Sequence, residues 1–96
     1  MLFRSAVRDA EVFEISVSKG ASIVGETLEE ADIAGYLSPN MIVVAVERDS
    51  EIIIPRGHTE IESDDLVTIF SKDGITEEVV TPFNPGRKES AQRKSK

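Results

Sequence analysis

The sequence of 96 residues lacks cysteine entirely and contains a single histidine. Without cysteine, the chain can form neither a disulfide framework nor a thiolate metal site. It also has no Gly-x-Ser-x-Gly motif and no glycine-rich loop of the kind that holds phosphates. Together with the scarcity of histidine, these absences argue against nucleophilic catalysis. We therefore predict that the protein is not an enzyme.

Long hydrophobic runs are also missing from the sequence. No run approaches the roughly twenty apolar residues that a membrane-spanning helix needs. The opening MLFRSAVRDA has no continuous apolar core of the type found in secretory signals. We therefore predict a cytoplasmic protein, which can still be peripheral to the membrane through a membrane-bound partner.

The charge is divided unevenly along the chain. Residues 1–83 carry 6 Lys and Arg against 17 Asp and Glu, a net charge of −11, whereas residues 84–96 carry 5 against 1, a net charge of +4. An acidic body repels phosphates, so we predict no nucleic-acid partner. The basic tail has no hydrophobic side chain larger than alanine and is predicted to be disordered. Contact of the tail with anionic lipid or RNA is the alternative.

The length predicts one domain at residues 11–83, between an N-terminal lead at 1–10 and the tail at 84–96. A body of this size buries a limited share of its surface and has no disulfide to compensate. Association through a sheet edge or an apolar face is the remaining source of stability. We therefore predict a homodimer.

Short runs rich in β-branched residues, which favour pleated sheets over helices, recur along the sequence. Three of them, at 41–46, 52–54 and 66–70, are separated by charged or turn-forming connections and predict an antiparallel meander. Residues 12–17 add a half-buried strand, because their apolar side chains alternate with polar ones.

Two short helices complete the predicted fold. Thr27 and Glu30 match a capping box at the start of the first helix. The second helix is predicted from Ile75, Val79 and Phe83, which recur at helical spacing, with Pro82 marking its end and Asp73 or Thr76 as its cap. The fold class is therefore α+β, with a small, mostly antiparallel β-sheet and two short helices.

The turn Pro55-Arg56-Gly57-His58 has the most unusual chemistry in the chain. Proline fixes φ and glycine permits a positive φ, while Arg56 and His58 offer cationic or polarisable groups against an acidic background. Arg48 lies on the preceding turn, and guanidinium groups bind phosphate or carboxylate in bidentate fashion. The candidate ligand-binding residues are Arg48, Pro55, Arg56, Gly57 and His58. The alternative is that both arginines pair with surface carboxylates and His58 is an ordinary surface residue.

A second candidate site is the acidic run of Glu60, Glu62, Asp64 and Asp65. In a strand the first three would share one face, where carboxylate oxygens could bind a divalent cation. The alternative is a solvated strand face that ends in a turn, because Ser63-Asp64-Asp65 suits turn geometry. The carboxylates of the first predicted helix are interpreted as ordinary helix-start residues, which the helix dipole favours.

A family resemblance rests mainly on the segment between residues 47 and 70. Its residues are Glu47-Arg48-Asp49, Glu51-Ile52-Ile53-Ile54-Pro55-Arg56-Gly57, Thr59, Ile61 and Asp65-Leu66-Val67-x-Ile69-Phe70. The same pattern continues upstream in residues 11–15, Gly20 and Val24-Gly25-x-Thr27-Leu28. Taken together, the pattern resembles the TrkA C-terminal domain, also called RCK_C, over about residues 10–83.

The resemblance implies a regulatory module without catalysis. Such domains usually follow a Rossmann-like RCK_N domain in cytoplasmic subunits of potassium channels and transporters. They dimerise, and in some members they bind a small ligand at the dimer cleft, with cyclic di-AMP and divalent cations among the ligand classes. If the resemblance extends to the ligand site, Pro55, Arg56 and His58 are the residues of this chain that would contact cyclic di-AMP.

The sequence departs from the family pattern in three ways. Asp64 stands where the family commonly has glycine, and aspartate tolerates the left-handed conformation better than most residues. The loop at 34–40 is longer than the usual link from helix to strand. The RCK_N domain is absent from these residues, so nucleotide sensing by that domain is not carried over.

From the residues and the resemblance together, we predict a regulatory ligand-sensing domain of a potassium or other cation transport system. A small ligand, cyclic di-AMP or another nucleotide, would bind at the dimer cleft and shift the population of subunit arrangements. The predicted partners are a second copy, a membrane ion channel or transporter subunit, and a separate protein that contains RCK_N. One alternative is a purely structural dimerisation module without a small-molecule ligand. The other is a divalent-cation sensor.

Overall fold

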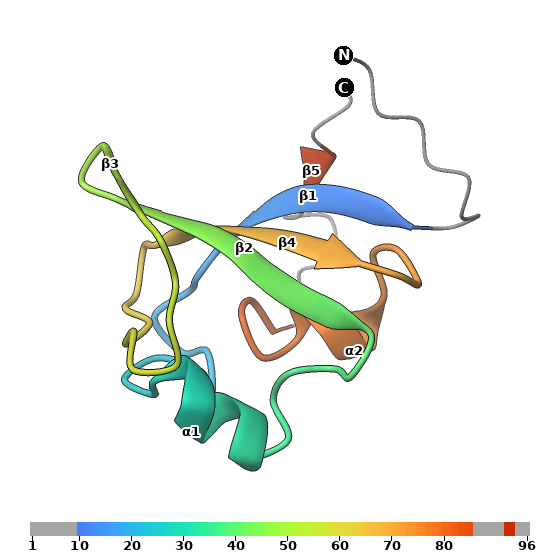
Figure 1. Cartoon of the computed structure of the whole chain (residues 1–96), viewed down its shortest axis with the longest axis horizontal. Helices are drawn as coiled ribbons and strands as arrows, with labels where there is room; N and C mark the ends of the chain where they lie inside the picture. The colour runs from blue at the N-terminus through green and yellow to red at the C-terminus, as the bar shows by residue number, and fades with distance from the viewer. Residues whose placement is uncertain (1–9, 86–91, 94–96) are drawn as a thin grey trace.

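The computed structural model describes residues 10–85 and 92–93 and consists of one antiparallel sheet with two short helices (Figure 1). The strand order is β3-β2-β4-β1-β5. The strands are β1 (Glu11–Ser16), β2 (Met41–Arg48), β3 (Glu51–Ile53), β4 (Leu66–Ser71) and β5 (Gln92–Arg93). The helices are α1 (Leu28–Ile33) and α2 (Glu77–Val80). The predicted α+β class is confirmed.

The predicted meander is wrong in one connection. β3 pairs only with β2 and lies at the edge, whereas β4 pairs with β2 and β1 in the middle of the sheet. The segment between β3 and β4, residues 54–65, is too long for a tight hairpin. It runs instead beside residues 24–29, where Gly25 N–H donates to Ile61 O over 2.8 Å and Ile61 N–H donates to Glu26 O over 3.0 Å. The sequence therefore identified strands β1 to β4 but not the path of the segment between β3 and β4.

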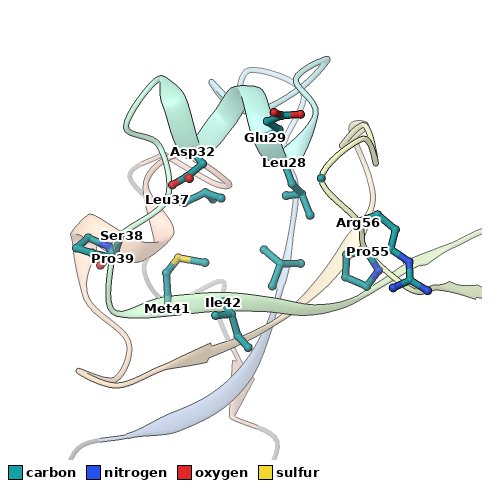
Figure 2. Close-up of a pocket in the computed structure, with 12 residues that line it drawn as sticks. Leu28, Glu29, Asp32, Leu37, Ser38, Pro39, Met41, Ile42, Pro55 and Arg56 are labelled. Atoms are coloured by element: carbon teal, nitrogen blue, oxygen red, sulfur yellow. The ribbon is translucent and has the colours of Figure 1, made fainter.

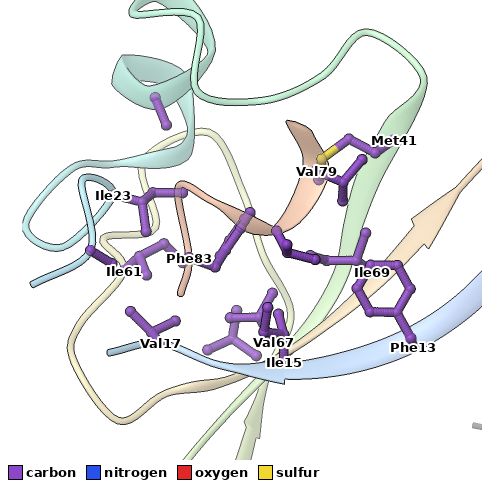
Figure 3. Packing of buried hydrophobic residues seen from close by; sticks show 14 residues of the cluster. Phe13, Ile15, Val17, Ile23, Met41, Ile61, Val67, Ile69, Val79 and Phe83 are labelled. Carbon is purple, nitrogen blue, oxygen red and sulfur yellow. The ribbon is translucent and has the colours of Figure 1, made fainter. Parts of the chain in front are cut away.

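The core lies between the inner face of the sheet and the two helices, which are on the same side of it (Figure 1). Phe13 and Ile15 of β1 pair with Ile69 and Val67 of β4, and all four side chains are fully buried. They pack with residues from the loops and from α2 in one cluster (Figure 3). The alternation predicted for residues 12–17 is therefore confirmed, because the polar positions between these residues face outward.

Both helices begin at the predicted capping residues. Thr27 and Glu30 form a complete capping box on α1, with Glu30 N–H donating to Thr27 Oγ1 over 3.1 Å and Thr27 N–H donating to Glu30 Oε1 over 2.9 Å. Thr76, not Asp73, caps α2 and accepts from Val79 N–H. α2 ends just before Pro82, as predicted, with Thr81 as its C-cap. Pro82 cannot donate to a helical ladder, and the chain turns there instead.

The two terminal segments lie mostly outside the described residues. The predicted lead at 1–10 is described only at Ala10, and the predicted disordered tail only at 84–85 and 92–93. Within that tail, Gln92–Arg93 form β5, which pairs with Phe13 and Glu14 of β1. A strand of two polar residues has no alternation that a sequence pattern could reveal. In residues 10–85, neither helix is long and apolar enough to cross a membrane.

Candidate functional site

Arg48 and Asp65 form a bidentate ion pair at the end of the central strands. Arg48 Nε donates to Asp65 Oδ1 over 2.8 Å, and Nη2 donates to Asp65 Oδ2 over 2.7 Å. Nη2 also donates to Glu60 O over 2.9 Å, and Nη1 lies 3.4 Å from Glu62 Oε2. Asp65 is 1% exposed and accepts a further bond from Glu62 N–H. The pair therefore ties the 54–65 segment to β2.

This ion pair gives Arg48 a structural role in the described fold. The hydrogen bond with Asp65 raises the pKa of Arg48 above its ordinary value, although partial burial acts in the opposite direction. The guanidinium therefore stays charged and occupied by protein partners at every physiological pH. The alternative considered from the sequence, that Arg48 pairs with carboxylates, matches this geometry, and one of the two carboxylates is buried.

The acidic run does not lie in a strand. Glu60 makes only an isolated bridge with Thr27, and residues 61–65 form the turn that leads into β4. Glu60, Glu62 and Asp64 are exposed, whereas Asp65 is buried against Arg48. Within residues 10–85 and 92–93, no group of three His, Cys, Asp or Glu side chains is arranged to hold a metal ion. The cation hypothesis depended on Glu60, Glu62 and Asp64 sharing one face of a strand. Because these residues do not form a strand, that shared face is not formed.

Asp64 adopts the backbone conformation that explains the family's preference for glycine at this position. Its φ is 72°, in the left-handed region, while its N–H donates to Val17 O over 2.8 Å. Aspartate tolerates this region better than most residues with a side chain. The turn predicted for Ser63-Asp64-Asp65 is thus confirmed.

We expect Asp64→Ala to lower the free energy of unfolding by about 1 kcal/mol, because alanine is strained at positive φ. Asp64→Gly should change it by less than about 0.5 kcal/mol, since relief of strain offsets the extra freedom of the unfolded chain. Urea unfolding followed by circular dichroism measures both variants. Equal stability of the two variants would contradict the assigned conformation, since Asp64 is exposed and the substitutions remove the same carboxylate.

A groove of about 440 Å³ lies between α1, the turn at 55–57 and the start of β2 (Figure 2). Three of the five candidate ligand residues, Pro55, Arg56 and Gly57, line it, whereas Arg48 and His58 do not. The turn is held in place because Arg56 N–H donates to Thr59 Oγ1 over 2.8 Å and Gly57 O accepts from Glu29 N–H over 2.9 Å. The structure therefore splits the predicted ligand set between a groove wall and a structural ion pair.

The groove combines an apolar lining with charges of both signs. Arg56 stands on one side, and Glu29 and Asp32 of α1 stand on the other (Figure 2). The apolar lining comes from Leu28, Leu37, Pro39, Met41, Val43 and Pro55. Ile42 borders the groove at the start of β2, but its side chain points to the opposite side of the strand from Met41 (Figure 2). Such a site suits a ligand with flat apolar surface, an anionic group for the guanidinium and a hydrogen-bond donor for the carboxylates.

The sequence did not identify the α1 side of this groove. Glu29 and Asp32 were interpreted as ordinary helix-start residues, and only their spacing of three, which places side chains on one helix face, could have joined them. The loop at 34–40, noted as longer than the family's usual link, supplies Leu37, Ser38 and Pro39 to the lining. The length of this loop was the signal in the sequence for the part of the groove that the loop lines.

Comparison with known sequences gives two matches over this region. The TrkA-C domain family matches residues 12–84. The Trk system potassium uptake protein TrkA homolog of Archaeoglobus fulgidus is 33% identical over 75 residues, which cover 78% of this chain. Those residues make up 16% of the relative, so the chain spans only a small part of the length of that protein.

The solved structures that share the fold include two of S. agalactiae BusR. One is the RCK_C domain dimer of S. agalactiae BusR in complex with c-di-AMP, with a TM-score of 0.60, 24% identity and coverage of 77% of this chain and 96% of that chain. The other is S. agalactiae BusR in complex with its busAB-promotor DNA, with a TM-score of 0.61, 20% identity and coverage of 90% of this chain and 40% of that chain. At these identities, the likeness shows a shared fold.

Proposed function

Because the chain belongs to the TrkA-C domain family, as the sequence resemblance predicted, we propose that it is a regulatory ligand-sensing domain of a potassium or other cation transport system. The groove beside Arg56 is the observation that supports ligand sensing most directly, because it combines one cation with an apolar lining. The domain would act by binding, not by catalysis, in the cytoplasm and alongside a membrane transport protein.

The proposed ligand is a cyclic dinucleotide of the cyclic di-AMP class. Arg56 would bind a phosphate, the apolar lining would contact a purine base, and Glu29 or Asp32 would accept from an adenine amino group. A single groove offers contacts for about half of a symmetric dinucleotide. A homodimer would supply the second half, and ligand would then favour one arrangement of the two subunits.

Nucleic acid is not a proposed ligand of this domain. The DNA-bound relative is a longer protein, of which this chain matches 40%. Residues 10–85 carry 16 acidic against 4 basic side chains, a net charge of −12, which opposes a phosphate backbone. A single phosphate at Arg56 requires only a local contact, so the acidic body is compatible with a small anionic ligand.

Arg56→Ala is expected to weaken binding of cyclic di-AMP about tenfold or more, because a charge-assisted hydrogen bond contributes about 1.5–3 kcal/mol. Isothermal titration calorimetry measures the dissociation constant. Lys72→Ala is the matched control, since it removes the same charge from an exposed residue outside the groove lining. Equal weakening in both variants would indicate a general charge effect and would count against the groove.

The sequence alternatives are outcomes of the same titration. A domain that binds neither cyclic di-AMP nor other adenine nucleotides, yet forms dimers, would be a structural dimerisation module. Selective stabilisation by Ca²⁺ or Mg²⁺ in a thermal-shift experiment, lost in Glu60→Gln/Glu62→Gln, would indicate a divalent-cation sensor. Either result would replace the proposed ligand.

A further inference from the structure

One face of the sheet is turned away from α1 and α2 (Figure 1). This face carries large exposed apolar side chains. Val12 of β1 and Ile42 of β2 flank Phe70 of β4 in one row across three strands. Ile52 pairs with Glu47 at the other end, and Ile54 follows by alternation along the chain. Val12 is 39% exposed, and Ile42, Ile52 and Ile54 are each 61–62% exposed. We call this surface, defined by these four side chains, the open face.

Exposure on this scale distinguishes the open face from an ordinary sheet surface. Antiparallel sheets that face water on one side usually carry polar residues there. Several large exposed apolar side chains on one sheet face instead point to an interaction site. The bulge between Val43 and Ala45 adds Val44, which is 44% exposed, to the same strand. The face therefore needs an occupant.

A partner is not expected to bind by adding a strand to the edge of β3. β3 has three residues and is followed closely by Pro55, which has no N–H to donate. The hairpin before it turns through Asp49 and Ser50, both at positive φ. A short edge blocked by proline is a typical defence against edge pairing. The occupant is therefore expected to pack on the face, not to extend the sheet.

Charge decides between the possible occupants of the open face. Glu47 lies on this side of β2, directly opposite Ile52 of β3, because its neighbour Val46 is buried inward. A second copy packed face to face would bring the Glu47 carboxylates of both copies into an interface that excludes water. An anionic membrane would be repelled by the net charge of −12 on residues 10–85. A cationic partner meets neither obstacle.

We propose that the open face docks a segment of a partner polypeptide that presents apolar side chains flanked by lysine or arginine. The apolar side chains cover Ile42, Ile52 and Ile54, and the cations meet Glu47 and the acidic body around it. This inference rests on the proposed function in one respect, because it assigns the docked segment to the membrane transport protein that the domain would regulate. Cytoplasmic loops of membrane proteins carry an excess of lysine and arginine, so they have the required charge.

The test uses a fluorescently labelled synthetic peptide of alternating leucine and lysine, with its leucine–glutamate counterpart as a control. Fluorescence anisotropy should detect binding of the lysine peptide only, with affinity that falls as salt rises. Ile52→Thr/Ile54→Thr should weaken binding about tenfold, because it removes apolar area from the face. Threonine keeps the β-branch that suits this edge. Ile33→Thr, at an 80% exposed position on α1, is the matched control and should bind as wild type.

Several results would overturn the proposal. Equal affinity of the double variant and wild type would show that the face is not used, and equal binding of the glutamate peptide would remove the role of charge. A wild-type dimer that becomes monomeric in Ile52→Thr/Ile54→Thr, seen by sedimentation equilibrium, would assign the face to a second copy. Neither substituted residue lines the groove, so cyclic di-AMP binding by the same variants tests the proposed function separately. Circular dichroism verifies that each variant is folded.

Discussion

Replacement of Arg48 by methionine is expected to lower the free energy of unfolding by about 3–5 kcal/mol, because it leaves a buried carboxylate without its cation. Asp65 is 1% exposed, and in the variant it keeps only the hydrogen bond that it accepts from Glu62 N–H among the bonds described above. The loss would shift the melting temperature by roughly 4 °C or more for each kcal/mol in a domain of this size. Urea unfolding followed by circular dichroism measures the free energy directly.

The double variant Arg48→Met/Asp65→Leu is the control for this prediction. Removal of both charges leaves no unpaired group, so the double variant should be more stable than Arg48→Met alone. Asp65→Leu alone should cost less than Arg48→Met, because the guanidinium side chain is 25% exposed and can reach water. If the double variant lost the sum of the two single effects, the residues would be energetically independent and the ion pair would not hold the 54–65 segment.

Replacement of Phe83 by alanine is expected to lower the free energy of unfolding by about 3–5 kcal/mol, the usual cost of removing a buried aromatic ring. Phe83 is fully buried and points into the cluster from the turn after α2 (Figure 3). Its backbone oxygen also accepts from Ser18 N–H over 3.0 Å, which joins the end of the body to the segment after β1. Differential scanning calorimetry or urea unfolding gives the magnitude.

Phe83→Leu separates the cavity from the loss of apolar contact. Leucine keeps much of the ring's volume, so the variant should lose clearly less stability than Phe83→Ala. Ile33→Ala, at an exposed position, should change the free energy of unfolding by no more than about 0.5 kcal/mol. A Phe83→Ala variant as stable as Ile33→Ala would contradict the placement of residue 83 in the core.

The groove and the ion pair show how far the sequence could define a site. The turn at 55–58 was singled out from its composition alone, and three of its four residues do line the groove. Arg48 was grouped with them because both turns carry arginine, but the sheet register brings Arg48 opposite Asp65. Glu47 of β2 pairs with Leu66 of β4. The next residue on β2 is Arg48 and the preceding residue on the β4 side is Asp65, so these two also face each other. Seventeen residues separate the partners along the chain, and no local pattern joins them.

Local signals in the sequence determined the strands β1 to β4, the two caps and the separation of an acidic body from a basic tail. These features depend on alternation, capping chemistry and charge, which act between neighbouring residues. Tertiary structure alone decided the strand order, the Arg48–Asp65 pair and the α1 wall of the groove. Each of these depends on the path of residues 54–65, which pack beside residues 24–29 instead of returning directly from β3. Contacts between segments far apart in sequence are set by packing of the whole chain, so they appear only when it is folded.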